Sequence, residues 1–223
     1  MYNLIEGSLT QQLRFDAVSN NLANVNSNGF KQDTLSFEMA LTMKNKTAID
    51  FSPGPVVHTG NPLDIALDGS GFFKVQTKAG IRYSRDGALG INNEGVLVNK
   101  SGDAVLGQNG PVRLNGGEIS IGPDGQISEN GAPGEKLMIA DFRDIKLLRK
   151  EGRSYFVYGG KDQDVIPAGK VNLRQNYIEK SNVNPTEEMI KMIESFRAFE
   201  SVQKAIQNLD EIVSKMVNDP DLL

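Results

Sequence analysis

The sequence predicts a mixed α and β protein, in which N- and C-terminal α-helices pair as a coiled-coil-like unit around a central all-β domain. Two observations predict this architecture. At both ends of the 223-residue chain, apolar residues recur at alternating spacings of three and four, as on one face of a helix. Between the ends, 19 of the 23 glycines fall from Gly60 to Gly160 and separate short β-branched runs such as "FFKVQT" and "SYFVYG".

Residues 1–25 carry the first helical pattern. Its stripe consists of Met1, Leu4, Ser8, Gln11, Phe15, Val18, Leu22 and Val25. Leu9 and Leu13 add apolar surface beside the stripe, so the apolar face is wider than one narrow seam requires. Because an isolated helix of this length is marginal in water, it needs a packing partner.

The segment "NNLANVNSNGFK", residues 20–31, ends this helix, because asparagine side chains compete with the backbone for hydrogen bonds. Residues 26–29 suit a reversal of the chain. Gly29 can take a positive φ there, and Phe30 can anchor the far side in a neighbouring pocket.

The middle of the chain reads as strands and turns. The segments "INNEGV" and "IGPDGQI" are typical of hairpin turns. Around the first turn lie Leu89, Ile91, Gly95 and Leu97. Thirty residues later, the same order of apolar residues and glycine recurs as Ile119, Ile121, Gly125 and Ile127. This spacing indicates that a hairpin is repeated. The repeat is too short to predict a solenoid.

The second helix begins at a well-marked boundary. Asn184 suits the N-cap, Pro185 the first helical position, and Glu187 can reach back as in a capping box. The apolar stripe that follows consists of Met189, Met192, Phe196, Phe199, Val202, Ile206, Leu209, Val213 and Met216.

These patterns divide the chain into parts. The expected parts are a helix and asparagine-rich turn (1–44), a linker (45–62), a central β domain (63–168) and a C-terminal helix (169–223), and a fragment spanning 45–180 is expected to be soluble. Two packings remain open. The helices bury their stripes on each other, or each packs separately on the β domain.

Composition argues against several function classes. Without cysteine and with His58 as the sole histidine, thiolate and polyhistidine metal centres cannot form, and no cofactor or metal is expected. The net charge of −4 with no basic face argues against nucleic acid. The N-terminus lacks the pattern of a cleaved signal peptide, and no apolar run is long enough for membrane insertion.

Catalytic residues are not expected either. The best acid candidates, Asp68, Asp86, Asp103 and Asp124, all adjoin a glycine, which is typical of hairpin turns. His58 lies among prolines and glycines with no partner, as a solvated loop histidine would. Neither an enzyme nor a small-molecule substrate is therefore predicted.

Three segments together resemble bacterial flagellar rod and hook proteins. "NNLANVNSNGFK" resembles their N-terminal signature, and "EKSNVNPTEEMIKMIESFRAFESVQKAIQNLDEIV", with Phe196, Arg197 and Phe199, resembles their C-terminal one. The stretch "NPLDIALDGSGFFKVQTKAGIRYSRDGALGINNEGVLVNKSGDAVLG" resembles the β domain of rod proteins that carry one. The resemblance covers essentially the whole chain.

The resemblance implies a non-enzymatic rod subunit of the flagellar basal body that serves motility. It implies terminal helices lining a hollow, torque-transmitting polymer, and partners that are other rod subunits, copies of itself and the type III export apparatus. The implied location is the periplasmic rod, reached without a cleaved signal peptide. Absence of cysteine suits export of an unfolded chain.

An assembly interface is expected on the two ends of the chain. Asn20, Asn21 and Asn24 are expected on the helix, where carboxamides can bond the backbone of adjacent subunits; the plainer alternative is a run that only caps one helix. The expected interface residues are Leu4, Phe15, Val18, Asn20, Asn21, Leu22, Asn24, Val25, Gly29, Phe30, Asn182, Asn184, Met189, Met192, Phe196, Phe199, Ile206 and Val213.

A different class remains as the alternative: a surface adhesin or ligand-binding β module that its terminal helices dimerise. A rod subunit should be largely monomeric, with protease-labile ends, and should form filaments or join rod partners. A coiled-coil dimer should be compact and protected throughout.

Overall fold

The computed structural model describes residues 2–35, 48–152, 154–169 and 171–218. The chain forms two compact units. The helical unit comprises residues 1–23, 33–50 and 184–223, and the β unit comprises residues 24–32 and 51–183. The chain therefore passes from one unit to the other after Ala23, Gln32, Asp50 and Val183.

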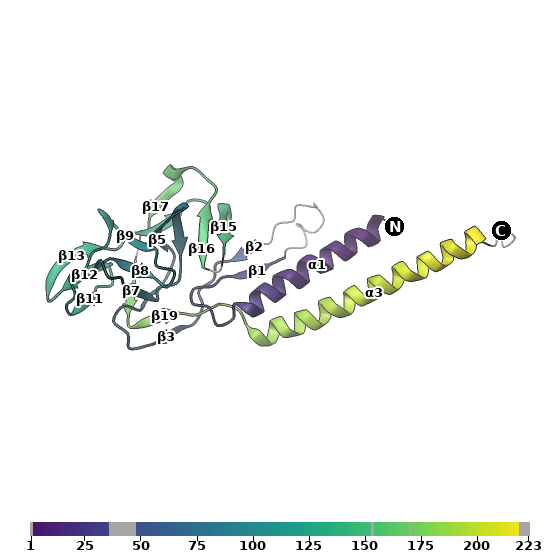
Figure 1. The fold of residues 1–223 in the computed structure, drawn as a ribbon, viewed down its shortest axis with the longest axis horizontal. Helices are drawn as coiled ribbons and strands as arrows, with labels where there is room; N and C mark the ends of the chain where they lie inside the picture. The colour runs from purple at the N-terminus through teal and green to yellow at the C-terminus, as the bar shows by residue number, and fades with distance from the viewer. Residues whose placement is uncertain (1, 36–47, 153, 170, 219–223) are drawn as a thin grey trace. The chain divides into compact units, whose positions relative to one another are not determined.

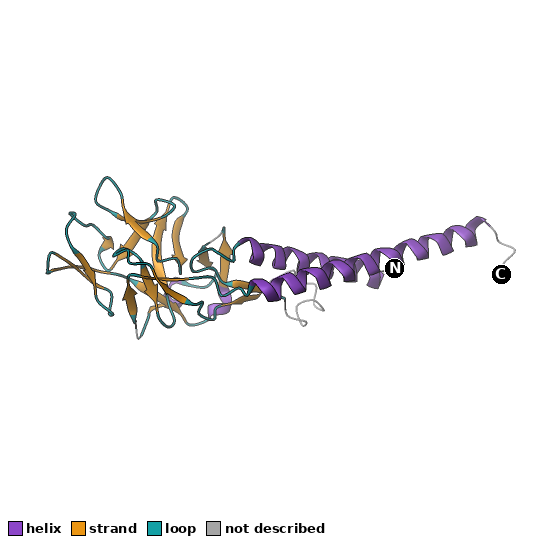
Figure 2. Cartoon of the chain, turned by 90° about the horizontal axis from the view of Figure 1, so that it is seen from below, coloured by secondary structure: helices purple, strands orange, loops and turns teal. Residues whose placement is uncertain are grey.

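Two helices, α1 (Tyr2–Ala23) and α3 (Pro185–Asn218), dominate the helical unit, and strands dominate the β unit (Figures 1 and 2). The strands are β1 (Gln32–Thr34), β2 (Ala48–Asp50), β3 (Val56–His58), β4 (Ile65–Leu67), β5 (Phe72–Thr77), β6 (Gly80–Ser84), β7 (Leu89–Ile91), β8 (Leu97–Asn99), β9 (Ala104–Gly107), β10 (Gly110–Pro111), β11 (Ile119–Ile121), β12 (Gln126–Glu129), β13 (Ala132–Lys136), β14 (Ile139–Phe142), β15 (Leu148–Glu151), β16 (Tyr155–Tyr158), β17 (Val165–Pro167), β18 (Leu173–Gln175) and β19 (Tyr177–Glu179). Two 3₁₀ turns, η1 (Ile145–Leu147) and η2 (Asp162–Asp164), complete the elements.

Helix α3 begins where the sequence indicates, whereas α1 ends earlier than expected. The expected N-cap of the second helix is confirmed, because Asn184 Oδ1 accepts a hydrogen bond from the Thr186 backbone N–H at 3.1 Å and α3 starts at Pro185. Helix α1 ends at Ala23, so Asn24 follows the helix and does not lie on it, contrary to the expectation. The Asn24 carbonyl instead accepts the Ser27 N–H in a turn.

The largest sheet of the β unit has ten strands, all paired antiparallel. Its main path runs β15-β16-β6-β5-β9-β8-β7; β10 pairs with β9, and β14 pairs with both β5 and β17. A three-stranded sheet, β11-β12-β13, and the two-stranded pairs β18-β4 and β19-β3 complete the unit. Strands β1 and β2 pair separately.

The repeated hairpin is confirmed. Strands β7 and β8 pair around the turn that ends at Gly95, and β11 and β12 pair around the turn that ends at Gly125. The two turns share the same backbone bonds, since Gly95 N–H donates to Asn92 and Gly125 N–H donates to Gly122. Both glycines have positive φ, at 74° and 87°, which explains why glycine occupies these positions.

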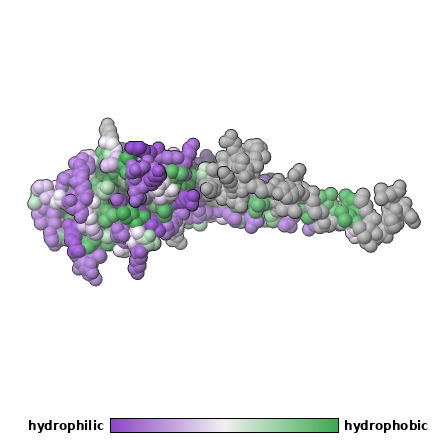
Figure 3. Space-filling view, turned by 90° about the horizontal axis from the view of Figure 1, so that it is seen from above, coloured by the Kyte–Doolittle hydropathy of each residue, from purple (hydrophilic) through white to green (hydrophobic). Residues whose placement is uncertain are grey.

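The β unit has an apolar core and an aromatic cluster beside it. The core gathers Ile65, Leu67, Phe73, Leu89, Leu97, Val105, Val112, Leu114, Ile121, Ile127, Leu137, Ile139 and Leu173. In the aromatic cluster, the ring centroid of Phe72 lies within 6 Å of the ring centroids of Phe51, Phe142 and Phe156, and the rings meet edge to face. Hydrophilic residues cover most of the visible surface of this unit (Figure 3).

The strands extend beyond the expected β domain of residues 63–168. The stretch expected as a linker, 45–62, carries β2 and β3, while β18 and β19 lie after residue 168. His58 is exposed as expected but belongs to strand β3, where its ring meets Tyr177 at 5.0 Å, so it is not a loop residue.

Candidate assembly surface

Helix α3 presents an apolar face to solvent. Met189, Ile190, Ile193 and Phe196 are each 53–54% exposed. Farther along the same helix, Leu209, Ile212 and Val213 are also exposed. A row of large apolar side chains in contact with water is costly, and on a folded protein it is typical of a protein-protein contact.

The other face of α3 is more buried. Its least exposed members recur at alternating spacings of four and three: Glu188, Met192, Ser195, Phe199, Val202 and Ile206. The exposed row of Met189, Ile193 and Phe196 runs beside this face, offset by about one residue. Helix α3 therefore carries two adjacent faces with apolar members, and one of them remains in contact with solvent.

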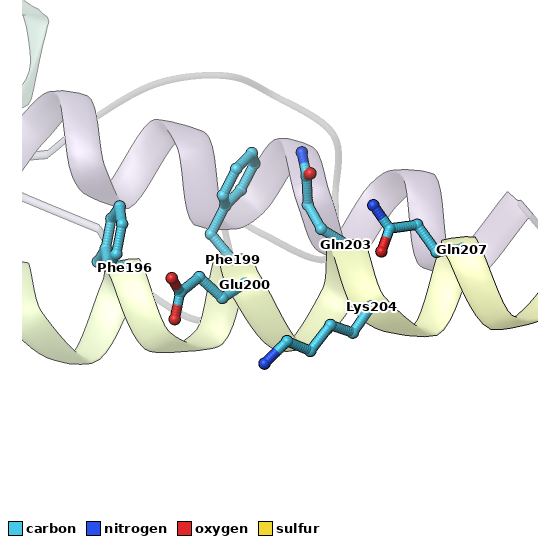
Figure 4. Close-up of a pocket in the computed structure, with 6 residues that line it drawn as sticks. All are labelled: Phe196, Phe199, Glu200, Gln203, Lys204 and Gln207. Carbon is cyan, nitrogen blue, oxygen red and sulfur yellow. The ribbon is translucent and has the colours of Figure 1, made fainter.

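A hollow of about 250 Å³ lies on α3 where these faces meet. Among the described side chains it is lined by Phe196, Phe199, Glu200, Gln203, Lys204 and Gln207. Figure 4 shows Phe196, Phe199, Gln203 and Gln207 pointing to one side of the helix, while Lys204 points to the other. The lining thus combines two phenylalanine rings with amide and charged side chains, a mixture that is common where protein surfaces meet.

Helix α1 is α3's neighbour within the helical unit and runs antiparallel to it (Figures 1 and 2). Ala17 and Val18 are buried on α1, whereas Leu9 and Phe15 are 44% and 39% exposed. Apolar surface therefore reaches solvent from both helices.

Asn21 joins three segments of the helical unit. Its side chain is 1% exposed, and its Nδ2 donates to the Asp33 carbonyl and to Glu188 Oε2, both at 2.9 Å. Its Oδ1 accepts the Asp33 N–H at 2.8 Å, so the carboxamide pairs with both the N–H and the C=O of one residue, as a strand neighbour would. Nearby, Asn20 Nδ2 donates to Asp33 Oδ2 at 2.7 Å. Both asparagines thus make hydrogen bonds inside the chain.

The segment 24–32 belongs to the β unit. Gly29 has a φ of 63°, as expected, and a Cβ at this position would lie 2.3 Å from the Arg85 carbonyl carbon, so only glycine fits. Phe30 is 1% exposed and lies under the Lys150 ammonium, whose Nζ is 3.9 Å from the ring centroid. Phe30 is therefore anchored in a pocket of its own unit.

Beside Phe30, the β unit buries three charges. Lys31, Glu179 and Arg85 have side chains only 1%, 1% and 3% exposed. Lys31 Nζ lies 2.6 Å from Glu179 Oε1, and Arg85 Nε lies 3.0 Å from Glu179 Oε2. Burial lowers the pKa of the Arg85 guanidinium, which the Glu179 carboxylate partly offsets. We call these three residues the Glu179 cluster.

The acids weighed as catalytic candidates serve turns and side-chain networks. Asp124 accepts from Gln126 N–H and Lys136, Asp103 accepts from the Tyr155 hydroxyl, and Asp68 accepts from Asn172. Asp86 Oδ1 accepts the Ala88 N–H, and burial is the largest cause of its raised pKa. The bonds of Asp124 to the Gln126 N–H and of Asp86 to the Ala88 N–H are those of turn residues, whereas Asp103 and Asp68 bond side chains that are remote in sequence.

The residues expected at an assembly interface differ in exposure. Phe15, Asn20, Asn184, Met189, Phe196 and Val213 are exposed; Leu22, Val25, Asn182, Met192, Phe199 and Ile206 are partly buried; and Val18, Asn21, Asn24, Gly29 and Phe30 are buried. The side chain of Leu4 falls outside the described part of the chain. The role of all of them in assembly stays a prediction.

Sequence reasoning missed several residues of this surface and of the β unit. Ile190, Ile193 and Ile212 each lie one residue away from the stripe that spacing indicated, and their apolar character was the available signal. Lys31, Glu179 and Glu188 gave no signal, because the burial of a charge depends on partners far away in the sequence.

Within the described residues, no helix combines the length and apolarity that crossing a membrane requires. In the same part of the chain, no three or more side chains of metal-binding type gather at one place.

Three protein-family models match successive parts of the chain. Residues 1–31 match a model described as flagella basal body rod protein. Residues 66–129 match the D1 domain of flagellar hook protein FlgE/F/G, and residues 174–219 match the C-terminal part of flagellar basal body rod FlgEFG protein. The first and last models cover the segments that resemble the terminal signatures.

Individual relatives extend the similarity over the whole chain. Flagellar basal-body rod protein FlgF of Caulobacter vibrioides is 31% identical over 95% of this chain and 94% of its own length. FlgG of Bacillus subtilis is 30% identical over 98% and 97%, and FlgF of Salmonella typhimurium is 29% identical over 92% of each chain.

The stretches "FSPGPVVHTGNPLDIAL" and "GPVRLNGGEISIGPDGQIS" favour the FlgF type, with the FlgG type next. Relatives of both types match at similar identity, so the similarity supports FlgF or FlgG without separating them. Over nearly its full length, this chain belongs to the family of bacterial flagellar basal-body rod proteins.

Proposed function

We propose that this chain is a structural subunit of the bacterial flagellar rod, which polymerises through its terminal helices to help form the hollow drive shaft. The observation that carries the proposal is the exposed row Met189, Ile190, Ile193 and Phe196, in a chain whose relatives are rod proteins. A contact between two different faces of identical subunits does not close on itself, so it propagates into a helical polymer.

The proposal includes pairing of α1 with α3 as a coiled-coil-like unit. The alternating spacing of Glu188, Met192, Ser195, Phe199, Val202 and Ile206 supports it, since this is the pattern of a helix seam. The hydrogen bond from Asn21 to Glu188 supports it as well, because it links the two helices at one end. With one face used inside the subunit, the offset face remains for neighbours.

The partners are other rod subunits and copies of this chain, and the location is the periplasmic part of the basal body. Export without a cleaved signal peptide, through the flagellar export apparatus, agrees with the absence of cysteine, because disulfides would obstruct the passage of an unfolded chain. The role is structural: the subunit carries torque and encloses the channel for exported proteins. No catalytic step is part of it.

The test is localisation of this chain in purified basal bodies. A small tag inserted in an exposed turn of the β unit, for example at Gly102, is labelled with gold and viewed by electron microscopy. The proposal expects labels confined to the rod between the two membranes, in bodies from cells that make the tagged chain. Labels on the outer cell surface, as for an adhesin, would contradict it.

A further inference from the structure

The Glu179 cluster lies near three of the four places at which the chain enters or leaves the β unit. Lys31 directly precedes the crossing after Gln32, and Ser52 lies just beyond the crossing after Asp50. Glu179 lies four residues before the crossing after Val183. Three segments, 28–32, 52–54 and 179–182, which are remote from one another in sequence, therefore meet around one carboxylate.

The bonds among these segments are numerous and short. They are Lys31 Nζ to Glu179 Oε1 (2.6 Å) and to the Ser52 carbonyl (2.7 Å), Gly54 N–H to Glu179 Oε1 (3.0 Å), Gly29 N–H to the Glu179 carbonyl (2.8 Å), Gln32 N–H to Asn182 Oδ1 (2.7 Å), Asn182 Nδ2 to the Ser52 carbonyl (3.2 Å) and Lys180 Nζ to Asn28 Oδ1 (3.0 Å). Each of them joins two different segments.

Backbone pairing alone would hold these segments weakly. Strand β19 pairs with β3 over only three residues, from Tyr177–Glu179 to Val56–His58. In contrast, the buried carboxylate of Glu179 is tied to two cations and one backbone amide. Removing one partner from such a group leaves a buried charge uncompensated, which is far more costly than losing an exposed ion pair.

The Arg85 side chain fastens this arrangement to the main sheet region. Its Nη1 donates to the Gly71 carbonyl and its Nη2 to the Gly69 carbonyl, both at 2.8 Å, while its Nε faces Glu179. Arg85 follows β6, and Gly71 precedes β5. The entry segments are thereby connected to the central strands and not only to one another.

We propose that the Glu179 cluster is a mechanical clamp. It fastens the chain segments that join the β unit to the helical unit, so that force arriving along any one of them is resisted by all of them together. The clamp is a property of the single subunit and does not depend on polymerisation; its use in carrying torque rests on the proposed function.

The experiment pulls the full chain by its two termini in an optical trap and measures how fast the β unit unfolds at a fixed force. The variant is Glu179→Gln, which keeps the size of the side chain but removes its charge. The matched control is Glu151→Gln, because Glu151 pairs with Arg82 in the same unit but is 48% exposed. We expect unfolding under force to be roughly tenfold faster or more in Glu179→Gln, and near the wild-type rate in the control.

Hydrogen exchange without force gives a local reading of the same variant. The Gly54 amide donates to Oε1 of Glu179, so its exchange should speed up in Glu179→Gln relative to wild type. This acceleration should be larger than that of amides in the hairpin β11-β12. If both variants unfold under force at the wild-type rate while the chain is folded, the clamp does not exist. Since single molecules are pulled, failure of polymerisation cannot produce this result.

A milder variant covers the case in which Glu179→Gln does not fold. Asn182→Ala removes the acceptor of the Gln32 amide and the donor to Ser52 but leaves both ion pairs in place. It should unfold under force about threefold to tenfold faster than wild type. A rate equal to that of the Glu151→Gln control would overturn the proposal.

Discussion

The two units of this molecule differ in the groups that they bury and the groups that they expose. The β unit places charges inside, where Lys31 and Glu179 are almost fully buried and paired. The helical unit leaves apolar side chains outside, where Met189, Ile193 and Phe196 are more than half exposed. The first unit pairs its buried charges within the chain, whereas the second leaves a row of large apolar side chains in contact with solvent among the described residues.

The largest effect is expected from removing the segment 24–32. A fragment spanning residues 45–180 lacks Phe30 and Lys31, so the Glu179 carboxylate keeps only Arg85 as a cation, and the Phe30 pocket is empty. We expect this fragment to be largely unfolded, contrary to what the sequence suggested. Its circular dichroism and solubility are the measurements, and a soluble fragment with a cooperative melt would show that the β unit does not need its entry segment.

Next in size is the variant Glu179→Leu in the full chain. Two buried cations lose their partner, so the free energy of unfolding of the β unit should fall by about 3–5 kcal/mol. Four of the five tyrosines lie in this unit, so near-ultraviolet circular dichroism during urea unfolding reports on it. The change Glu151→Leu, at an ion pair whose carboxylate side chain is 48% exposed, should cost less than about 1 kcal/mol. If both variants lowered the free energy of unfolding equally, burial of the Glu179 cluster would not contribute to stability.

A variant of the helical unit should show the opposite behaviour. Phe196→Asp places a carboxylate on the exposed apolar face, so association of the chain should weaken by about 100-fold or more, while the urea midpoint of the β unit stays unchanged. Sedimentation velocity over a range of protein concentrations measures the association.

The control for this variant is Ser201→Asp, at an exposed position of the same helix that does not line the hollow. It introduces the same carboxylate away from the apolar face, so it should associate nearly as wild type does. If Phe196→Asp associates normally as well, the exposed face is not a contact surface.

The smallest expected effect concerns Asp86 and pH. Burial raises the pKa of this carboxyl in the folded state, so its contribution to stability is complete below the unfolded-state pKa and is lost as pH rises through the folded-state pKa. Asp86→Asn should therefore be more stable than wild type at pH 7, and this advantage should vanish below the ordinary carboxyl pKa of 3.8. Urea unfolding at pH 3 and pH 7 measures both values, and a constant difference would contradict this reasoning.

The sequence predicted helix boundaries and turns better than it predicted which residues are buried and which are exposed. Helix boundaries at Asn184 and hairpin turns at Gly95 and Gly125 depend on local chemistry, namely a side-chain cap and positive φ, so a few adjacent residues were sufficient. The apolar stripe of α3 was found, but it mixed residues of two faces: Met189 and Phe196 are exposed, whereas Met192 and Phe199 are partly buried. Spacing alone cannot separate the two faces, because both contain apolar residues.

The division of the chain depended on contacts that spacing does not encode. Residues 24–32 follow a helix in sequence, yet they fold with the β unit through Lys31 and Glu179, which are 148 positions apart. The asparagine-rich run likewise has internal uses at Asn21, which is bound to Asp33 and Glu188. Patterns within one segment cannot reveal a partner that the fold brings from the other end.

The contrast between the two units can be measured in one experiment, hydrogen exchange of the full chain at increasing protein concentration. We expect amides of α3 between Met189 and Val213 to become more protected as the chain associates, and amides of the β unit not to change. Protection of α3 that is already complete in the dilute monomer, with no association at high concentration, would contradict it.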